Sequence, residues 1–133
     1  MFEWKTEYSL GIHTIDGQHQ VLFRLAGELR ESILSKSSPP DMGKIIDRLV
    51  QYVQVHFAYE ERLMRAVEYP DLPAHQLEHE ALTRRVEQLL DAFREGHCPI
   101  TIRLLKLLKD WLEDHIMGSD PKYVPYVKKT PLA

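Results

Sequence analysis

Apolar side chains recur every three to four residues along four stretches of the chain, which is the period of an amphipathic helix. The predicted helices cover residues 17–37, 41–67, 72–93 and 100–117. Asp16 is the expected N-cap of the first helix, and Gly118 is the expected end of the last. No stretch alternates convincingly with the period of two that a strand requires. The pattern therefore predicts an all-α fold, an antiparallel up-down four-helix bundle with irregular N- and C-terminal arms.

A length of 133 residues predicts a single domain over residues 1–133, with one core that needs no disulfides. The net charge of −3 implies neither a nucleic-acid-binding surface nor a disordered acidic tail. Cys98 is the single cysteine, so we expect a reduced, cytoplasmic protein. The N-terminus lacks the pattern of a signal peptide. No apolar run approaches the roughly 18 residues of a membrane span, so no membrane association is expected.

Histidines interrupt the apolar stripes of all four predicted helices. The polar side chains on these inward stripes are His19, His56, Glu60, His75, His79 and His115. A lone histidine in such a place is usually a hydrogen-bonded core residue. Burying so many polar groups without partners would cost about 1 to 3 kcal/mol each, which in sum rivals the stability of a domain. Metal coordination removes this cost because it satisfies the lone pairs and compensates the carboxylate charge. The stripes therefore predict a metal site inside the bundle.

The spacing within the second and third helices supports this prediction. His56 and Glu60, like His75 and His79, are four residues apart, so each pair is stacked on one helix face and can reach one ion or two adjacent ions. Residues 75–79 also match the H-x-x-E-H pattern of inverted zinc peptidases. That reading leaves the remaining histidines unexplained and places Glu78 about 100° away from the stripe, so we reject it.

Asp120 is a further candidate ligand that the helix period does not supply. On a continuing helix it would point about 140° away from His115. Gly118 and Pro121 make such continuation improbable, and the chain can then fold Asp120 back over the helix end. A solvated loop aspartate is the alternative, and the residues alone leave both open.

Other polar side chains lie outside the inward stripes. His13 belongs to the N-terminal arm and His97 to a loop, so neither is expected to bind metal. Glu61 points about 100° away from Glu60, and a surface ion pair with Arg65 is expected for it.

The number of donors favours two ions. The candidates are His19, His56, Glu60, His75, His79, His115 and Asp120, too many for one closed zinc site. Two metals fit if both carboxylates and one oxo or hydroxo group bridge them, which leaves one coordination position open. Imidazole-rich ligation suits iron and excludes magnesium and calcium. The H-x-x-x-E and H-x-x-x-H spacings also differ from the Glu-x-x-His spacing of ferritin-type di-iron bundles.

Four segments of the chain resemble the hemerythrin family, in particular its single-domain bacterial members. They are Trp4 with YSLGIHTIDGQH, the HFAYEERLM block, HQLEH and WLEDHIMGSD, and the resemblance covers nearly the whole length. It implies one iron bound by three histidines and a second bound by two, with both carboxylates bridging. The implied three-histidine set is His75, His79 and His115, the two-histidine set is His19 and His56, and the bridges are Glu60 and Asp120.

The resemblance implies reversible dioxygen binding at the five-coordinate iron. It also implies that the protein is not an enzyme. The protein would act in oxygen transport, storage or delivery, possible clients being oxygen-using enzymes. Helix phase suggests an apolar O2 pocket lined by Phe57, Trp111, Leu112 and Ile116. An O2 sensor that acts through a partner, or a di-iron peroxidase or oxidase with a tyrosine such as Tyr59 as proton donor, are the alternatives. We expect a monomer, with the two arms as the alternative route to association.

Overall fold

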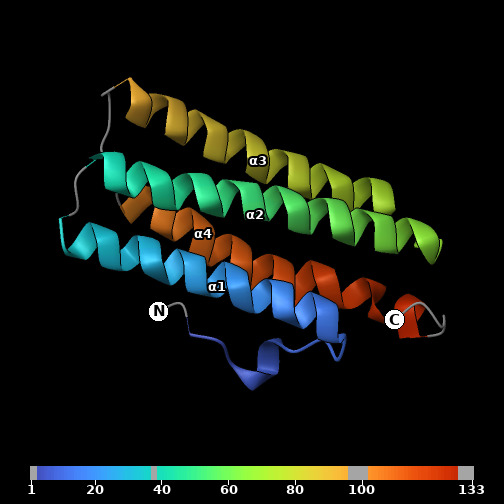
Figure 1. The fold of residues 1–133 in the computed structure, drawn as a ribbon. Helices are drawn as coiled ribbons and strands as arrows, with labels where there is room; N and C mark the ends of the chain where they lie inside the picture. Colours follow the sequence, from blue (N-terminus) through green and yellow to red (C-terminus); the bar gives the residue numbers. More distant parts are fainter. Residues whose placement is uncertain (1–2, 37–38, 96–101, 129–133) are drawn as a thin grey trace.

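Four long helices pack side by side in the computed structural model, which describes residues 3–36, 39–95 and 102–128 (Figure 1). The long helices are α1 (His13–Leu34), α2 (Pro39–Ala66), α3 (Leu72–Arg94) and α4 (Ile102–Asp114). Each runs opposite to the one before it, and the described residues contain no strand. The predicted all-α antiparallel bundle is therefore confirmed.

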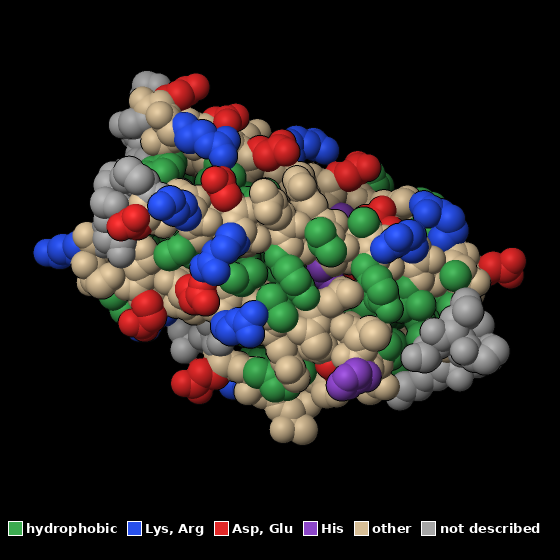
Figure 2. Space-filling view, viewed as in Figure 1, with side chains coloured by type: hydrophobic (Ala, Val, Ile, Leu, Met, Phe, Trp, Pro, Cys, Tyr) green, Lys and Arg blue, Asp and Glu red, His purple; other side chains and the backbone are tan. Residues whose placement is uncertain are grey.

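The apolar stripes form the core, in which Leu22, Leu29, Ile46 and Leu112 are almost fully buried. Acidic and basic side chains are interspersed over the outer face that Figure 2 shows. In the described part of the chain, no helix is long and apolar enough to cross a membrane.

The start of α1 differs from the expectation. The helix begins at His13 with Ile12 as its N-cap, so the prediction of Asp16 as N-cap was wrong. The Asp16 carboxylate instead accepts hydrogen bonds from the Ser9 hydroxyl at 2.5 Å and from the Leu10 backbone N–H at 2.8 Å. An aspartate in the first helical turn can tie down the incoming chain as well as cap the helix, and here the N-terminal arm takes its oxygens.

The C-terminal arm is helical, where an irregular segment was expected. After α4 the chain forms a π-helical turn η2 (His115–Ser119), a 3₁₀ turn η3 (Asp120–Tyr123) and a short helix α5 (Val124–Lys128). Gly118 lies inside η2 and does not end the helical path. Tyr123 and Val127, four residues apart, are fully buried in a second apolar cluster with Ile15 and Met64. This burial holds the arm against the end of the bundle.

The link between α2 and α3 contains one residue in the left-handed region. Glu68 has φ 57°, and the following Tyr69 donates its backbone N–H to the Met64 carbonyl at 2.9 Å. This is a common way to end a helix, and glycine is the residue that adopts it most easily.

Candidate metal centre

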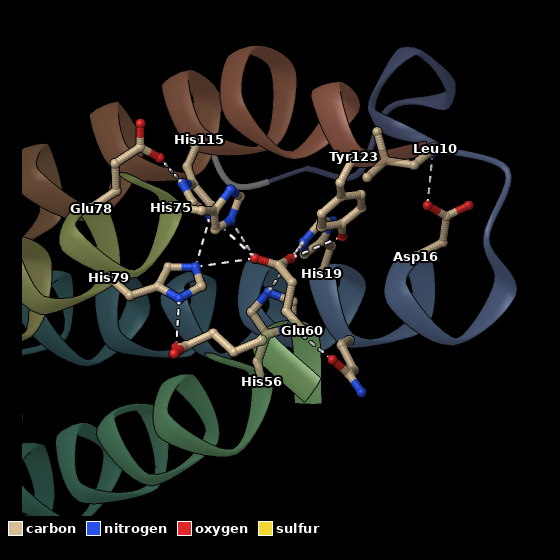
Figure 3. A network of polar contacts seen from close by, with 12 residues as sticks. Leu10, Asp16, His19, His56, Glu60, His75, Glu78, His79, His115 and Tyr123 are labelled. Carbon is tan, nitrogen blue, oxygen red and sulfur yellow. Dashed lines mark hydrogen bonds and ion pairs between the residues drawn. The ribbon is translucent and has the colours of Figure 1, made fainter. Parts of the chain in front are cut away.

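The carboxylate of Glu60 on α2 lies fully buried at the centre of the bundle among five imidazoles (Figure 3). Its Oε1 atom faces one group of ring nitrogens, at 2.7 Å from His75 Nε2, 3.0 Å from His79 Nε2 and 3.5 Å from His115 Nε2. These three histidines come from α3 and from the turn η2 that follows α4. One carboxylate oxygen is thus shared by three imidazoles.

The other oxygen of Glu60 faces histidines of α1 and of α2 itself. Oε2 lies 3.4 Å from His56 Nε2 and 4.0 Å from His19 Nε2. His56 is one turn before Glu60 on α2, and His19 is on α1. Glu60 therefore stands between a group of three histidines and a group of two, with one oxygen directed at each.

The donor atoms in each group have the separations that a metal ion requires. Within Glu60, His75, His79 and His115, and within His19, His56 and Glu60, the possible ligand atoms all lie within 4.8 Å of one another. His79 Nε2 and His115 Nε2 are 3.1 Å apart. Neighbouring ligands of an ion with bonds of about 2.0–2.1 Å are themselves about 3 Å apart. The residues brought together here therefore fit a metal-binding cluster.

Three of the histidines are held by partners on their outer nitrogens. His56 Nδ1 lies 2.6 Å from Gln18 Oε1. His79 Nδ1 lies 2.9 Å from Glu61 Oε2, and His115 Nδ1 lies 3.2 Å from Glu78 Oε2. Oxygen acceptors at these distances favour the Nδ1–H tautomer, which directs the Nε2 lone pair into the cluster. This is the tautomer that a metal ligand needs.

Two of these partners were misjudged from the sequence. Glu61 was expected to pair with Arg65 on the surface, but its side chain is only 24% exposed and reaches His79. Glu78 was given no part in the site, yet it reaches His115 with a side chain that is 48% exposed. Both lie about 100° from the inward stripe of their own helix, so helix phase alone directs them away from the site.

The charge of Glu60 is stabilised by its neighbours. Burial by itself raises the pKa of this carboxyl. In the metal-free protein, where ring Nε2 atoms can carry a proton, the charge interaction with His56 and hydrogen bonds from the imidazoles outweigh burial and hold the pKa of Glu60 well below its usual range. Glu60 therefore stays an anion, which is the form that binds a cation.

Two of the four expected pocket residues, Phe57 and Trp111, lie against rings of the histidine cluster. The Phe57 ring stacks on His79 with centroids 3.8 Å apart and planes 6° apart, and the Trp111 ring stacks on His115 at 5.0 Å and 17°. Leu112 and Ile116 are buried in the same core cluster as Phe57. The Phe57 ring also lies 6.0 Å from the ring of His56, so it borders both histidine groups. The assignment of these four side chains as an O2 pocket stays a prediction.

Some candidates lie elsewhere or outside the description. The side chain of Asp120 is not among the described residues, although its backbone begins η3. His97 and Cys98 also fall outside the described part of the chain. His13 is exposed at the start of α1 and belongs to neither donor group. Tyr59 donates its hydroxyl to Thr14 Oγ1 at 3.1 Å, so in this structure it does not point to Glu60.

Tyr123 is a site residue that the sequence reading missed. Its buried hydroxyl donates a hydrogen bond to Glu60 Oε2 at 3.0 Å, and its ring lies against His75 with centroids 5.8 Å apart. The available signal was the spacing of Tyr123 and Val127, which predicts one turn of helix with a buried face. Glu60 Oε2 thus has a phenol as well as imidazoles around it.

Comparisons with known proteins agree with this geometry. A family model described as "Hemerythrin HHE cation binding domain" matches residues 10–127. A bacteriohemerythrin of Stenotrophomonas maltophilia is 34% identical over 125 residues, which is 94% of this chain and 80% of that protein. A bacteriohemerythrin of Clostridium acetobutylicum is 30% identical over 131 residues, 93% of this chain and 99% of that protein. A crystal structure of wild-type hemerythrin superposes with a TM-score of 0.88 at 28% identity, over 94% of this chain and 96% of that one.

Proposed function

The chain belongs to the hemerythrin family, and from that membership we propose that it binds dioxygen reversibly at a non-haem di-iron centre. The observation that carries the proposal is the position of Glu60, whose two oxygens face two separate groups of histidines. A single ion would leave one of these groups without a metal. Two ions would use all five imidazoles and share the buried carboxylate of Glu60.

The proposed ligands follow from these two groups. His75, His79 and His115 would hold one iron, His19 and His56 would hold the other, and Glu60 would serve both. In this proposal Asp120 would be a further ligand, and an oxo or hydroxo group would complete the centre. The group with fewer histidines, His19 and His56, would leave its ion room for an external ligand, and dioxygen is the ligand that we propose.

When bound, the two ferrous ions supply the two electrons that O2 accepts on binding and returns on release. The residues of the chain provide the surroundings in which this exchange stays reversible. Gln18, Glu61 and Glu78 fix the imidazole tautomers. In the proposed pocket Phe57 and Trp111, with Leu112 and Ile116, exclude water and other reactants.

We propose that the protein carries, stores or delivers oxygen for an oxygen-using enzyme. We propose that it does so in the cytoplasm, as a monomer. A sensor acting through a partner would use the same site. A di-iron peroxidase or oxidase needs a proton donor close to the centre, and the hydroxyl of Tyr123 on Glu60 is the observation in its favour. We place reversible binding first because the cluster is closely enclosed by buried side chains.

One experiment separates these functions. The protein is loaded anaerobically with two ferrous ions per chain, exposed to O2 and then degassed while its absorption spectrum is followed. A charge-transfer band that appears with O2 and vanishes on degassing supports reversible binding. Conversion within seconds to a stable diferric form with release of peroxide would support the oxidase instead. Failure to retain iron would refute the di-iron proposal.

A further inference from the structure

Three tyrosines connect the buried carboxylate to the surface of the molecule. The hydroxyl of Tyr123 contacts Glu60 (Figure 3), the rings of Tyr123 and Tyr69 have centroids 6.3 Å apart, and those of Tyr69 and Tyr126 are 5.2 Å apart. The exposed fraction increases along this tyrosine series from 0% for Tyr123 through 6% for Tyr69 to 38% for Tyr126. We propose that the tyrosine series is a one-electron route, which carries oxidising equivalents from the metal centre to the surface. This inference rests on the proposed di-iron function.

The route is built from segments that are distant in sequence. Tyr69 lies in the link between α2 and α3, Tyr123 ends η3, and Tyr126 is in α5. Both ring pairs are edge-to-face, with interplanar angles of 86° and 68°. Such pairs are in close contact. Electron transfer between neighbouring phenols is close to thermoneutral, because the donor and the acceptor have the same chemistry, so no step along the series is strongly uphill.

The chemistry balances when hydrogen peroxide is the oxidant and the centre is half-oxidised, with one Fe²⁺ and one Fe³⁺. Reduction of peroxide to two waters breaks the O–O bond and takes two electrons and two protons. A half-oxidised centre, when bound, would supply one of these electrons from its Fe²⁺. Tyr123 supplies the second electron and its phenolic proton, and solvent supplies the other proton. Without this phenol, the second electron would be missing and a hydroxyl radical would be released.

The radical on Tyr123 then moves outward. Tyr69 reduces it by giving up one electron and a proton, and Tyr126 in turn reduces Tyr69. The hole ends on the partly exposed ring of Tyr126, where a thiol or another one-electron reductant can reduce it. The oxidising equivalent thus leaves the site without damage to the histidines or the apolar lining.

A second aromatic side chain next to the cluster is less suited to this role. Trp111 stacks on His115 and is half-buried. Its indole N–H is buried and has no hydrogen-bond acceptor within the part of the chain that the structure describes. Oxidised tryptophan would therefore keep its proton as a high-energy cation. The Tyr123 hydroxyl already donates along a hydrogen bond, so its proton can leave as the electron leaves.

The test uses protein carrying two irons per chain, half-oxidised with ferricyanide and then mixed with hydrogen peroxide. Freeze-quench electron paramagnetic resonance detects the tyrosyl radical, and peptide mass spectrometry locates the adduct formed with a nitroso spin trap. The expected result is an adduct on Tyr126. Tyr69→Phe should abolish that adduct, because phenylalanine cannot be oxidised by a neighbouring tyrosyl radical, while iron content and the O2 band stay as in the wild type.

The controls separate this route from other sources of oxidation. Tyr52 is half-buried on α2 and packs in the other core cluster, so Tyr52→Phe should leave the Tyr126 adduct unchanged. Equal labelling of Tyr52 and Tyr126 in the wild type, or an unchanged Tyr126 adduct in Tyr69→Phe, would mean attack by diffusing hydroxyl radicals and would overturn the route. Iron content and O2 binding are measured first, because their failure removes the proposed function as well, whereas unchanged adducts in a normally loaded protein overturn the route alone.

Discussion

The carboxylate of Glu61 should control how tightly the three-histidine group holds metal. It lies 2.9 Å from His79 Nδ1 on a side chain that is largely shielded from solvent. Removing an outer-shell partner of a metal-bound histidine typically weakens metal binding by about 10- to 100-fold, which is about 1.4 to 2.7 kcal/mol. We expect Glu61→Ala to fall in this range. Glu61→Gln should lose less, because the amide oxygen can still accept the Nδ1–H hydrogen bond.

The same reasoning gives two matched comparisons. Glu78→Ala should cost less than Glu61→Ala, because Glu78 lies 3.2 Å from His115 Nδ1 and its side chain is about half exposed. Arg65→Ala should leave metal affinity unchanged, since the partner of Glu61 is His79 and not a surface arginine. Anaerobic competition between the protein and a chromophoric chelator for ferrous iron measures each affinity. Equal losses in Arg65→Ala and Glu61→Ala would show that Glu61 acts through an ion pair with Arg65, and would refute the assignment of its contact with His79 as the source of the effect.

Three further predictions follow from the site and the fold. His79→Ala should lose iron and unfold at a lower temperature. His13→Ala, at the exposed start of α1, should match the wild type in metal analysis and thermal melting. Similar behaviour of the two variants would contradict the assignment of the donor groups. The pKa of Glu60 is held below its ordinary value, so its contribution to the free energy of unfolding is present above that value and is lost as pH falls through the lowered pKa. Melting of metal-free protein should therefore show an acid-side decline that is shallower in Glu60→Gln, and parallel curves would contradict this. Glu68→Gly should raise the free energy of unfolding by about 1 kcal/mol, because glycine adopts the left-handed conformation at the end of α2 without strain. Chemical denaturation measures the change. A decrease would show that the Glu68 side chain contributes more to stability than the strain costs.

The donors of the cluster were predictable because each depends mainly on its own helix. A period of 3.6 residues places His56 and Glu60, or His75 and His79, on one face together with apolar residues. The need to bury that face then brings the same side chains from all four helices to one interior. The structure places these pairs, with His115 of η2, around a common centre. The all-α bundle follows from the same local pattern.

The tertiary structure decided which atoms meet across helices. Helix phase directs Glu61 and Glu78 away from the stripe, but long side chains at a helix–helix boundary can turn toward the neighbour, and here both reach imidazole nitrogens. Aspartate is a residue type favoured at helix N-caps, yet the Asp16 carboxylate accepts hydrogen bonds from the N-terminal arm instead. These outcomes depend on the separation of packed elements, which the period along one helix does not contain.

Tyr123 shows this division most clearly. Its sequence neighbourhood predicts at most a buried turn, whereas its contact with Glu60 depends on the path of the chain after η2. Only the fold of the C-terminal arm over the end of the bundle brings that hydroxyl to Glu60, 63 residues away in sequence. Periodicity along the chain thus determined which side chains face inward, because the direction of a side chain depends on its own helix. Packing between segments determined their partners, because the distance between two side chains depends on how both segments are placed.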